Sequence, residues 1–455
     1  MEPASLSRTD VHLRAWPLVF ANAAIPLAAA VDTFVLGLSG NASELGGVAL
    51  GGTVFSVFYW SFYFLRMGTT GLTAQADGAQ RHNSLIRILV RALLIGTLLG
   101  LLVLVFSPLI ATGGFMILQG GPDAEAMGRE YFLARAWGAP AALAGFALSG
   151  WLIGLNRNLQ TTMIYVLFSA VNIGLDLVFV LMLEMGPAGV GYATSIADWL
   201  ALALALLLAW RTIQQRGGLE TDTLSMARLR DPAALLELFQ VNINLMLRTW
   251  SMVIGFSWFA NAGARQGDAV LAGNHVLLQI ISLWAFVLDA FAFVAESEAG
   301  RAFGRASRSA LRRAIRLTAE PMIVAGTVFA VLTAMWGDEV LTVLIANEEA
   351  RTAAIRYLPW CAIVPLLGVP AWLLDGVFIG TTSGKVLRNA GFASLAIYLA
   401  LDAVLAPQWG NQGVWAAFVL YYIARAGALA VAYPGLERRL QSVPTASETD
   451  EKPSA

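Results

Sequence analysis

The chain has 455 residues, of which 58% are hydrophobic and 13% are charged, and its formal net charge is −1 at pH 7. Soluble globular proteins carry about 25% charged residues, so the composition excludes a soluble protein and indicates one that crosses a membrane many times. The near-zero net charge provides no electrostatic attraction to nucleic acid, and no nucleic-acid partner is expected.

Residues that build metal and cofactor sites are scarce. Cys361 is the only cysteine, so neither an intrachain disulfide nor a cysteine metal cluster can form. The three histidines, His12, His82 and His275, lie far apart and match no metal-ligand spacing. The chain also lacks the phosphate-binding sequence G-x-x-x-x-G-K-[ST], so it carries no ATPase of its own. No cofactor and no resident metal are therefore expected.

Twelve apolar segments, each long enough to cross a bilayer as a helix, can be read along the chain. They lie near residues 12–38, 46–70, 88–112, 130–154, 160–183, 187–210, 235–260, 268–292, 313–336, 353–379, 388–406 and 411–434. The polar N-terminus lacks the features of a cleavable signal peptide, so the first segment is expected to act as the insertion signal. The sequence predicts an all-α integral membrane protein.

The longest internal polar stretch, Arg211–Asp231, separates six segments from six. We expect an N-terminal six-helix lobe (1–212), a cytoplasmic linker (213–234) and a C-terminal six-helix lobe (235–436). The remaining residues, 437–455, are rich in Ser, Thr, Glu and Asp and are expected to form a disordered cytoplasmic tail.

Arginine placement predicts the orientation of the spans. The loops that follow even-numbered spans are basic, whereas those that follow odd-numbered spans carry few positive charges and several acids. The basic residues of the former are Arg81, Arg87, Arg157, Arg211, Arg216, Arg228, Arg230, Arg301, Arg305, Arg308, Arg312, Arg313, Lys385 and Arg388. Because positively charged loops stay in the cytoplasm, both termini are predicted to be cytoplasmic.

The two halves of the chain resemble each other at a nearly constant offset. A shift of 222 residues places Gly78 on Gly300, and a shift of 226 places Gly154 on Gly380 and Asp176 on Asp402. Six spans per half is an even number, so both halves keep the same orientation in the membrane. Repeats of this kind form two pseudo-symmetric bundles around a central cavity, and their rocking gives alternating access.

Asp32 is the most informative polar residue because it lies within the first apolar span. A carboxylate is costly in hydrocarbon, so it should face the protein interior or a water-filled cavity. Pro17 and Pro26 lie on the same segment, and each removes a helix hydrogen bond, so this helix can bend. An acid on a bendable helix suggests a conformational change driven by a proton or a cation; the alternative is a structural acid bonded to a neighbouring helix.

Further polar residues of the first half lie on spans 5 and 6. Asn172 and Asp176 are four residues apart on span 5 and share a helix face, and Thr194 and Asp198 lie on span 6. Two carboxylates and an amide can hold a shared proton or an oxygen-liganded cation such as Na⁺. Asn172 and Thr194 could instead serve only as hydrogen bonds between helices.

The second half carries four acids within or beside its spans. Asp289 and Glu296 are seven residues apart and share a face of span 8, Asp375 lies in span 10 and Asp402 in span 11. With Asp198, they are candidates for contacts to a cationic substrate or for a second polar site. Glu296 and its neighbour Glu298 approach a basic loop, which favours a structural salt bridge there.

Four sequence segments resemble the multidrug and toxic compound extrusion (MATE) transporters, in particular the DinF-like branch. They are Val31-Asp32-Thr33, FLRMGTTGLTAQADGA (64–79), LDAFAFVAESEAG (288–300) and WLLDGVFIGTT (372–382). The resemblance implies a V-shaped pair of six-helix lobes and secondary drug efflux. It also implies ion coupling through Asp32, Asn172, Asp176 and Thr194, and a hinge at Pro17. An acid on span 7, which other branches use, is missing from Val241–Ala260.

The sequence therefore predicts a monomeric antiporter of the bacterial inner membrane that exports amphipathic or cationic organic compounds in exchange for protons. Sodium coupling at the same residues is the alternative within transport. A lipid-linked substrate flippase would require a strongly basic cavity, but Arg248 and Arg425 are the main basic residues within spans. A membrane enzyme would require a nucleophile–base pair or a histidine–carboxylate cluster within the spans, and none is evident. We expect the protein not to be an enzyme.

Overall fold

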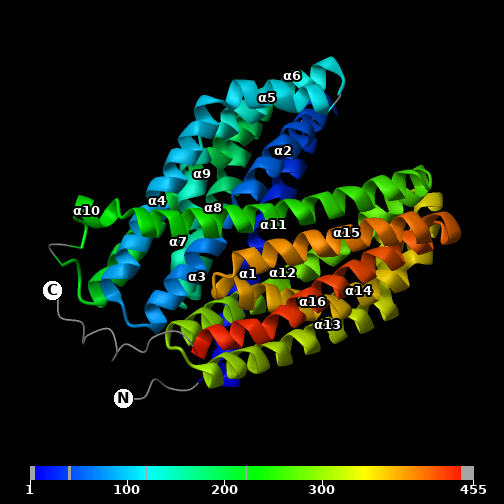
Figure 1. Cartoon of the computed structure of the whole chain (residues 1–455). Coiled ribbons are helices and arrows are strands. Elements are labelled where there is room, and N and C mark those ends of the chain that lie inside the picture. The colour runs from blue at the N-terminus through cyan, green and yellow to red at the C-terminus, as the bar shows by residue number, and fades with distance from the viewer. Residues whose placement is uncertain (1–5, 39–41, 119, 221–222, 442–455) are drawn as a thin grey trace. The chain divides into compact units, whose positions relative to one another are not determined.

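The computed structural model of the chain describes residues 6–38, 42–118, 120–220 and 223–441. Throughout these ranges the regular structure is helical (Figure 1). The predicted tail, residues 437–455, begins within the last helix, Asn411–Gln441. Residues 442–455 of this tail lie outside the described residues.

The helices of the first half are short and often broken. They are α1 (Arg8–Leu38), α2 (Ala42–Phe62), α3 (Phe64–Gly78), α4 (His82–Val105), α5 (Ser107–Ile117), α6 (Pro122–Ala136), α7 (Ala139–Gly154), α8 (Asn158–Asp176), the π-helical segment η1 (Leu177–Met182), α9 (Gly186–Gln215) and the short α10 (Met226–Leu229). The α6–α7 pair is bent by 54°. Pro140, in the first turn of α7, cannot donate to Ala136 four residues earlier, which explains why α6 ends there.

The helices of the second half are longer and continuous. They are α11 (Pro232–Ala264), α12 (Asp268–Gly304), α13 (Arg308–Leu344), α14 (Glu348–Gly380), α15 (Gly384–Trp409) and α16 (Asn411–Gln441).

These helices match the predicted spans. Among the described residues, nine helical stretches are long and apolar enough to cross a membrane, and the bent α6–α7 pair makes a tenth. The other two predicted spans, the first and the seventh, fall on α1 and α11. The all-helical membrane fold predicted from the sequence is confirmed.

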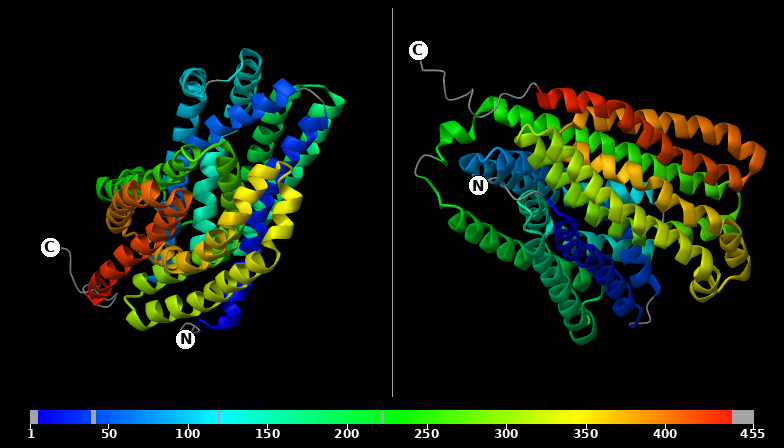
Figure 2. Two further views of the ribbon diagram at one scale, coloured as in Figure 1. Left: turned by 90° about the vertical axis from the view of Figure 1, so that its right-hand side faces the viewer. Right: turned by 90° about the horizontal axis from the view of Figure 1, so that it is seen from below.

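The described chain forms two compact units. One comprises Trp16–Leu238, and the other joins the chain up to Ala15 to the chain from Phe239 onward. In the first unit, α2 packs on α6, α4 on α7 and α8 on α9. In the second unit, α14 packs against both α12 and α13, and α15 runs beside α16, as the orange and red helices of Figure 2 show.

The internal repeat reappears in helix packing. A Cβ atom on Gly154 of α7 would lie 2.8 Å from the carbonyl oxygen of Thr70 on α3. A Cβ atom on Gly380 of α14 would clash with the carbonyl oxygen of Glu296 on α12. Both members of the second pair are shifted by 226 residues from those of the first (154 + 226 = 380; 70 + 226 = 296). Each half therefore has a glycine at the equivalent position, which lets the equivalent pair of helices approach closely: α3 and α7 in the first half, α12 and α14 in the second.

Helix α1 is shared between the two units. Its first turns pack on the second-half helices, where Val11 and Ala15 are buried beside Leu288 of α12. Arg14 forms a salt bridge of 2.5 Å with Glu298 at the same place. From Trp16 onward α1 belongs to the other unit. The change of unit comes immediately before Pro17.

A reciprocal cap begins α1 outside the membrane-spanning part. The backbone N–H of Asp10 donates to the Ser7 hydroxyl oxygen (3.1 Å), and the Ser7 N–H donates back to the Asp10 carboxylate (2.9 Å). The Ser7 hydroxyl also donates to this carboxylate (2.6 Å), and these hydrogen bonds hold the pKa of Asp10 below its usual value. The cap gives α1 a well-defined start in the second-half unit.

Candidate functional site

Helix α1 positions Asp32 two turns before the helix ends. The side chain is half-buried, and its Oδ1 atom is buried without a hydrogen-bond partner among the described residues. A buried carboxylate oxygen that accepts no hydrogen bond is energetically costly. Asp32 is therefore suited to take up a proton or to contact a cation.

Helices α8 and α9 present the remaining residues of the predicted coupling site. Asn172 and Asp176 are buried on α8, and Thr194 is buried on α9. The Asn172 side-chain amide donates to the Thr194 hydroxyl oxygen (3.2 Å), which itself donates to the carbonyl of Val190 (2.8 Å). These bonds fix the amide group between the two helices.

The four residues meet in the structure. The carboxyl groups of Asp32 and Asp176 lie within hydrogen-bonding reach of each other, and Asn172 also reaches Asp32. Both carboxylate oxygens of Asp176 are buried and receive no hydrogen bond from the described residues. Ionised carboxylates only accept hydrogen bonds, so two of them can bond to each other only when one holds a proton. The arrangement can hold a shared proton, or a cation bound by oxygen atoms.

The backbone changes form beside this pair. Helix α8 ends at Asp176, and the π-helical turn η1 starts at the next residue, Leu177. Each residue added in a π-turn rotates the side chains that follow relative to a regular α-helix. Such turns are rare and occur often at functional sites. The widened turn is a local irregularity directly next to the acid pair.

An ion pair borders the site. Arg135 of α6 and Asp198 of α9 form a buried salt bridge of 2.6 Å. Ser195 supports it, because its hydroxyl accepts from the N–H of Gly138 (3.1 Å) and donates to the carbonyl of Ala134 (2.8 Å). Asp198, predicted as a candidate substrate contact, is thus held by an arginine.

Arg135 is a residue that the sequence reading missed. Its guanidinium group lies 4.4 Å from the ring centroid of Phe55, and it acts electrostatically on Asp32 as well as on Asp198. A charged residue within the fourth apolar segment was the available signal. It was obscured because Arg135 lies close to the polar start of that segment, where arginine is ordinary.

Comparison with known protein families decides the classification. The MatE family model matches two stretches of the chain, residues 17–178 and 243–404, which together cover more than half of it. The chain belongs to the MatE family. The two matched stretches begin 226 residues apart (243 − 17 = 226), the same offset that relates Asp176 to Asp402.

Individual relatives agree with this classification. The chain is 34% identical over 421 residues to "DNA damage-inducible protein F" of Escherichia coli (strain K12), covering 92% of this chain and 90% of the relative. It is 25% identical to the "Probable multidrug resistance protein NorM" of Bradyrhizobium diazoefficiens, with 90% of each chain covered. The solved "Crystal structure of MATE in the bent conformation" has the same fold, with a TM-score of 0.85 at 18% identity over 95% of each chain.

The second half of this MatE protein holds its acids differently. Asp375 of α14 accepts hydrogen bonds from two buried arginines, Arg248 of α11 and Arg425 of α16. Asp289 of α12 lies close enough to Arg425 to act on it electrostatically. The structure therefore brings these two acids together around a pair of guanidinium groups.

Asp402, the repeat counterpart of Asp176, is held by donors. Its Oδ2 atom accepts from the indole N–H of Trp258 (2.8 Å) and from Arg265 (3.2 Å). Asp176 has no such donor among the described residues. The two halves of this MatE chain have thus diverged at equivalent positions: Asp402 is bound by donors through its Oδ2 atom, whereas neither oxygen of Asp176 has a donor among the described residues.

The two glutamates at the end of α12 lie apart from these clusters. Glu296 is buried where α12 meets α14. Glu298 binds Arg14 (2.5 Å) and Arg301 (3.2 Å), which is the structural salt bridge expected for this region.

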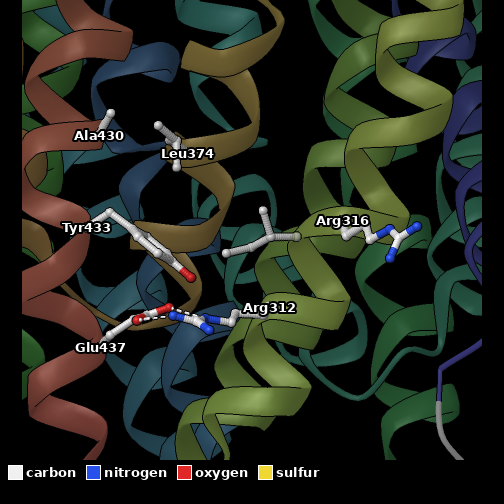
Figure 3. Close-up of a pocket in the computed structure, with 7 residues that line it drawn as sticks. Arg312, Arg316, Leu374, Ala430, Tyr433 and Glu437 are labelled. Carbon is white, nitrogen blue, oxygen red and sulfur yellow. Dashed lines mark hydrogen bonds and ion pairs between the residues drawn. The ribbon is translucent and has the colours of Figure 1, made fainter.

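The predicted coupling residues do not line the groove shown in Figure 3. This groove of about 380 Å³ lies between α13, α14 and α16 of the second half. Within it, Arg312 binds Glu437 through two hydrogen bonds of 2.7 and 2.9 Å, next to Tyr433. Figure 3 shows the side chains of Arg312 and Glu437 directed toward each other, so the charge of Glu437 compensates that of Arg312.

Across the part of the chain that the structure describes, no three His, Cys, Asp or Glu side chains are grouped as metal ligands. A transition-metal site of that kind is absent from these residues. A sodium ion would instead draw on the oxygen atoms of Asp32, Asp176, Asn172 and Thr194.

Proposed function

We propose that this chain is a secondary active antiporter that exports amphipathic, cationic organic compounds in exchange for protons. Membership of the MatE family supports export of small organic compounds coupled to an ion gradient, and a relative is named as a multidrug resistance protein. The observation that carries proton coupling is the contact between Asp32 and Asp176, of which Oδ1 of Asp32 and both oxygens of Asp176 are buried without a donor among the described residues.

The chemistry of this pair couples protonation to helix position. With one proton, the carboxyl groups can share a hydrogen bond that holds α1 against α8. Without it, two negative charges face each other in a medium of low dielectric constant, where their repulsion is strong. With both groups protonated, the pair loses its charge and its demand for a cation. Each state favours a different distance between the two helices.

Movement of α1 transmits this change. We propose Pro17 as the hinge, since its missing N–H weakens the helix where α1 leaves one unit and enters the other. Protonation of Asp32 changes its hydrogen bonds to α8 and lets α1 bend, so that the first-lobe cavity shrinks and substrate is expelled. Support comes from a related fold that has been solved in a bent conformation.

Alternating access follows from the repeat. The predicted lobes, residues 1–212 and 235–436, are proposed to rock against each other, with residues 213–234 as the linker. We further propose a monomer in the bacterial inner membrane with both termini in the cytoplasm, as the arginine-rich loops indicate.

Sodium coupling is the second candidate. Four oxygen-bearing side chains, Asp32, Asp176, Asn172 and Thr194, converge from three helices, and hard cations bind such oxygen atoms. A flippase for lipid-linked substrates is less well supported, because Arg248 and Arg425 both bind Asp375 and offer no free basic cavity. The family consists of transporters, which argues against a membrane enzyme.

The test uses the purified chain in liposomes with ethidium as the transported cation. An imposed pH gradient should drive ethidium movement in sodium-free buffer, and ethidium should elicit proton release that a pH-sensitive dye records. Transport that requires sodium and ignores the pH gradient would assign the four residues to sodium coupling. Absence of both responses would overturn the proposed transport function.

A further inference from the structure

A stripe of polar side chains on α8 faces α1. Thr162, Ser169, Asn172 and Asp176 are separated by seven, three and four residues, which places them on one side of the helix. Asn172 and Asp176 belong to the site described above. Thr162 and Ser169 lie further back along the same stripe, toward the start of α8.

Both hydroxyl groups bind the backbone of α1. The Thr162 hydroxyl donates to the carbonyl oxygen of Pro17 (2.6 Å), and the Ser169 hydroxyl donates to the carbonyl oxygen of Ala24 (3.0 Å). Each bond joins residues 145 positions apart. The same offset carries Asp32 to position 177, next to Asp176. The two helices therefore run parallel, in one register, from the hinge to the acid pair.

The two bonds differ in their distance from the hinge. Thr162 binds Pro17 itself, where a bend produces the least displacement. Ala24 lies seven residues beyond Pro17, or about 10 Å along a helix, and Asp32 lies about 22 Å beyond it. When α1 bends at Pro17, the carbonyl of Ala24 must move away from Ser169, whereas that of Pro17 can stay in place.

Thr162 also has a second acceptor. Its hydroxyl lies 3.0 Å from the carbonyl oxygen of Asn158, one turn earlier on α8. A hydroxyl donates one hydrogen bond, so Thr162 can bind its own helix whenever the Pro17 carbonyl is displaced. Thr162 therefore keeps a hydrogen bond within α8 when its bond to α1 breaks. For Ser169, the structure gives the Ala24 carbonyl as its acceptor.

We propose that Ser169 is a positioning residue that holds α1 against α8 and so sets the balance between the two forms of α1, with Thr162 marking the pivot. This inference rests on the proposed bending of α1. Ser169 is buried, and a buried hydrogen bond contributes about 0.5–1.5 kcal/mol, so its loss should change the balance about two- to tenfold. Its hydroxyl does not touch the acid pair and acts only through the backbone of α1.

The experiment measures the position of α1 directly. After replacement of Cys361 by Ala, cysteines introduced at the exposed Phe34 of α1 and Leu98 of α4 carry spin labels, and their distance distribution is recorded in lipid nanodiscs at fixed pH. In Ser169→Ala, the population in which α1 has left α8 should grow about two- to tenfold. Thr162→Val should change it less.

A control variant separates this effect from general damage. Ser107 of α5 is buried to a similar extent. Its hydroxyl donates to the carbonyl of Leu104 (2.8 Å), three residues earlier in the chain, so this bond does not hold α1. Ser107→Ala should leave the distance distribution unchanged. If Ser169→Ala also leaves it unchanged, or if Thr162→Val has the larger effect, the proposal is wrong. Ethidium transport by the unlabelled wild type tests the proposed function separately, so that the two failures can be told apart.

Discussion

At the scale of single residues, what distinguishes the candidate site is how few donors surround its carboxylates. Asp198, Asp375 and Asp402 all bind arginine side chains in the structure. Asp32 and Asp176 instead face each other, and Oδ1 of Asp32 and both carboxylate oxygens of Asp176 are buried with no donor among the described residues. An arginine beside a carboxylate favours its charged form, whereas two carboxyl groups in contact can share a proton.

Replacement of Asp32 by Asn tests whether the Asp32–Asp176 pair couples transport to protonation. The amide keeps the size of the side chain and can donate a hydrogen bond to Asp176, but it cannot release a proton. Asp32→Asn should reach the membrane in normal amounts and abolish resistance to ethidium in a sensitive host. Resistance at the wild-type level would exclude Asp32 as the coupling residue.

The repeat offers a matched comparison for Asp176. Asp176→Asn should abolish proton release in liposomes, since the partner of Asp32 is lost. Asp402→Asn changes the equivalent residue of the second half, whose amide oxygen can still accept from Trp258, and should cost about 1 kcal/mol of stability while transport continues. Equal loss of proton release in both variants would contradict coupling by the first half alone.

At the scale of elements, α1 is the helix whose parts are held differently. Its first turns are tied to second-half helices, where Arg14 binds Glu298, and its later turns are tied to α8 through Ser169 and Asp32. Pro17 lies between the two attachments. A helix anchored on both sides of a proline concentrates any bend at that residue.

The proline itself can be tested by substitution. In a helix interior, Pro is about 3 kcal/mol less favourable than Ala, so Pro17→Ala should stiffen α1. We expect slower ethidium transport with unchanged ethidium binding. Structures determined at low and high pH would show whether α1 changes shape. If α1 has one shape at both values and Pro17→Ala transports normally, bending is not part of the mechanism.

At the scale of the whole molecule, the proposed mechanism requires α1 to carry the effect of a local protonation to the second half of the chain. The first turns of α1, up to Ala15, belong to the unit formed from Phe239 onward. The acid pair, Asp32 and Asp176, belongs to the unit Trp16–Leu238. The attachment of the first turns includes the Arg14–Glu298 salt bridge (2.5 Å) and an exposed pair, Arg8–Glu320 (2.7 Å). Surface pairs contribute little, so the partly buried bridge should matter more.

A charge swap examines this attachment. Arg14→Glu places two acids against each other and should slow ethidium transport severalfold, while ethidium binding persists. Adding Glu298→Arg restores opposite charges and should recover most of the rate. Arg8→Glu, at the exposed pair, serves as the comparison and should have a smaller effect. If Arg14→Glu transports at the wild-type rate, the attachment of the first turns of α1 to Glu298 has no part in coupling.

Much of this protein could be predicted from its sequence. Spans are set by runs of apolar residues, because unpaired backbone groups are too costly in lipid for any form but a helix or a closed barrel. The repeat could be recognised in the sequence because glycine recurs at helix contacts that have no room for a side chain, as at Gly154 and Gly380. The pairing of Asp32 with Asn172 and Asp176 was predicted from family resemblance, and their roles stay a prediction.

Only the tertiary structure decided which charges find partners. Arg135, Arg248 and Arg265 each lie far along the chain from the acid they bind, so local patterns contain no sign of the pairing. The asymmetry between Asp176 and Asp402 arises in the same way, since the donors to Asp402 come from α11 and from the turn that follows it. Hydropathy determines that a chain crosses the membrane and how often. The packing of distant helices determines which buried acids are bound by arginine and which face each other.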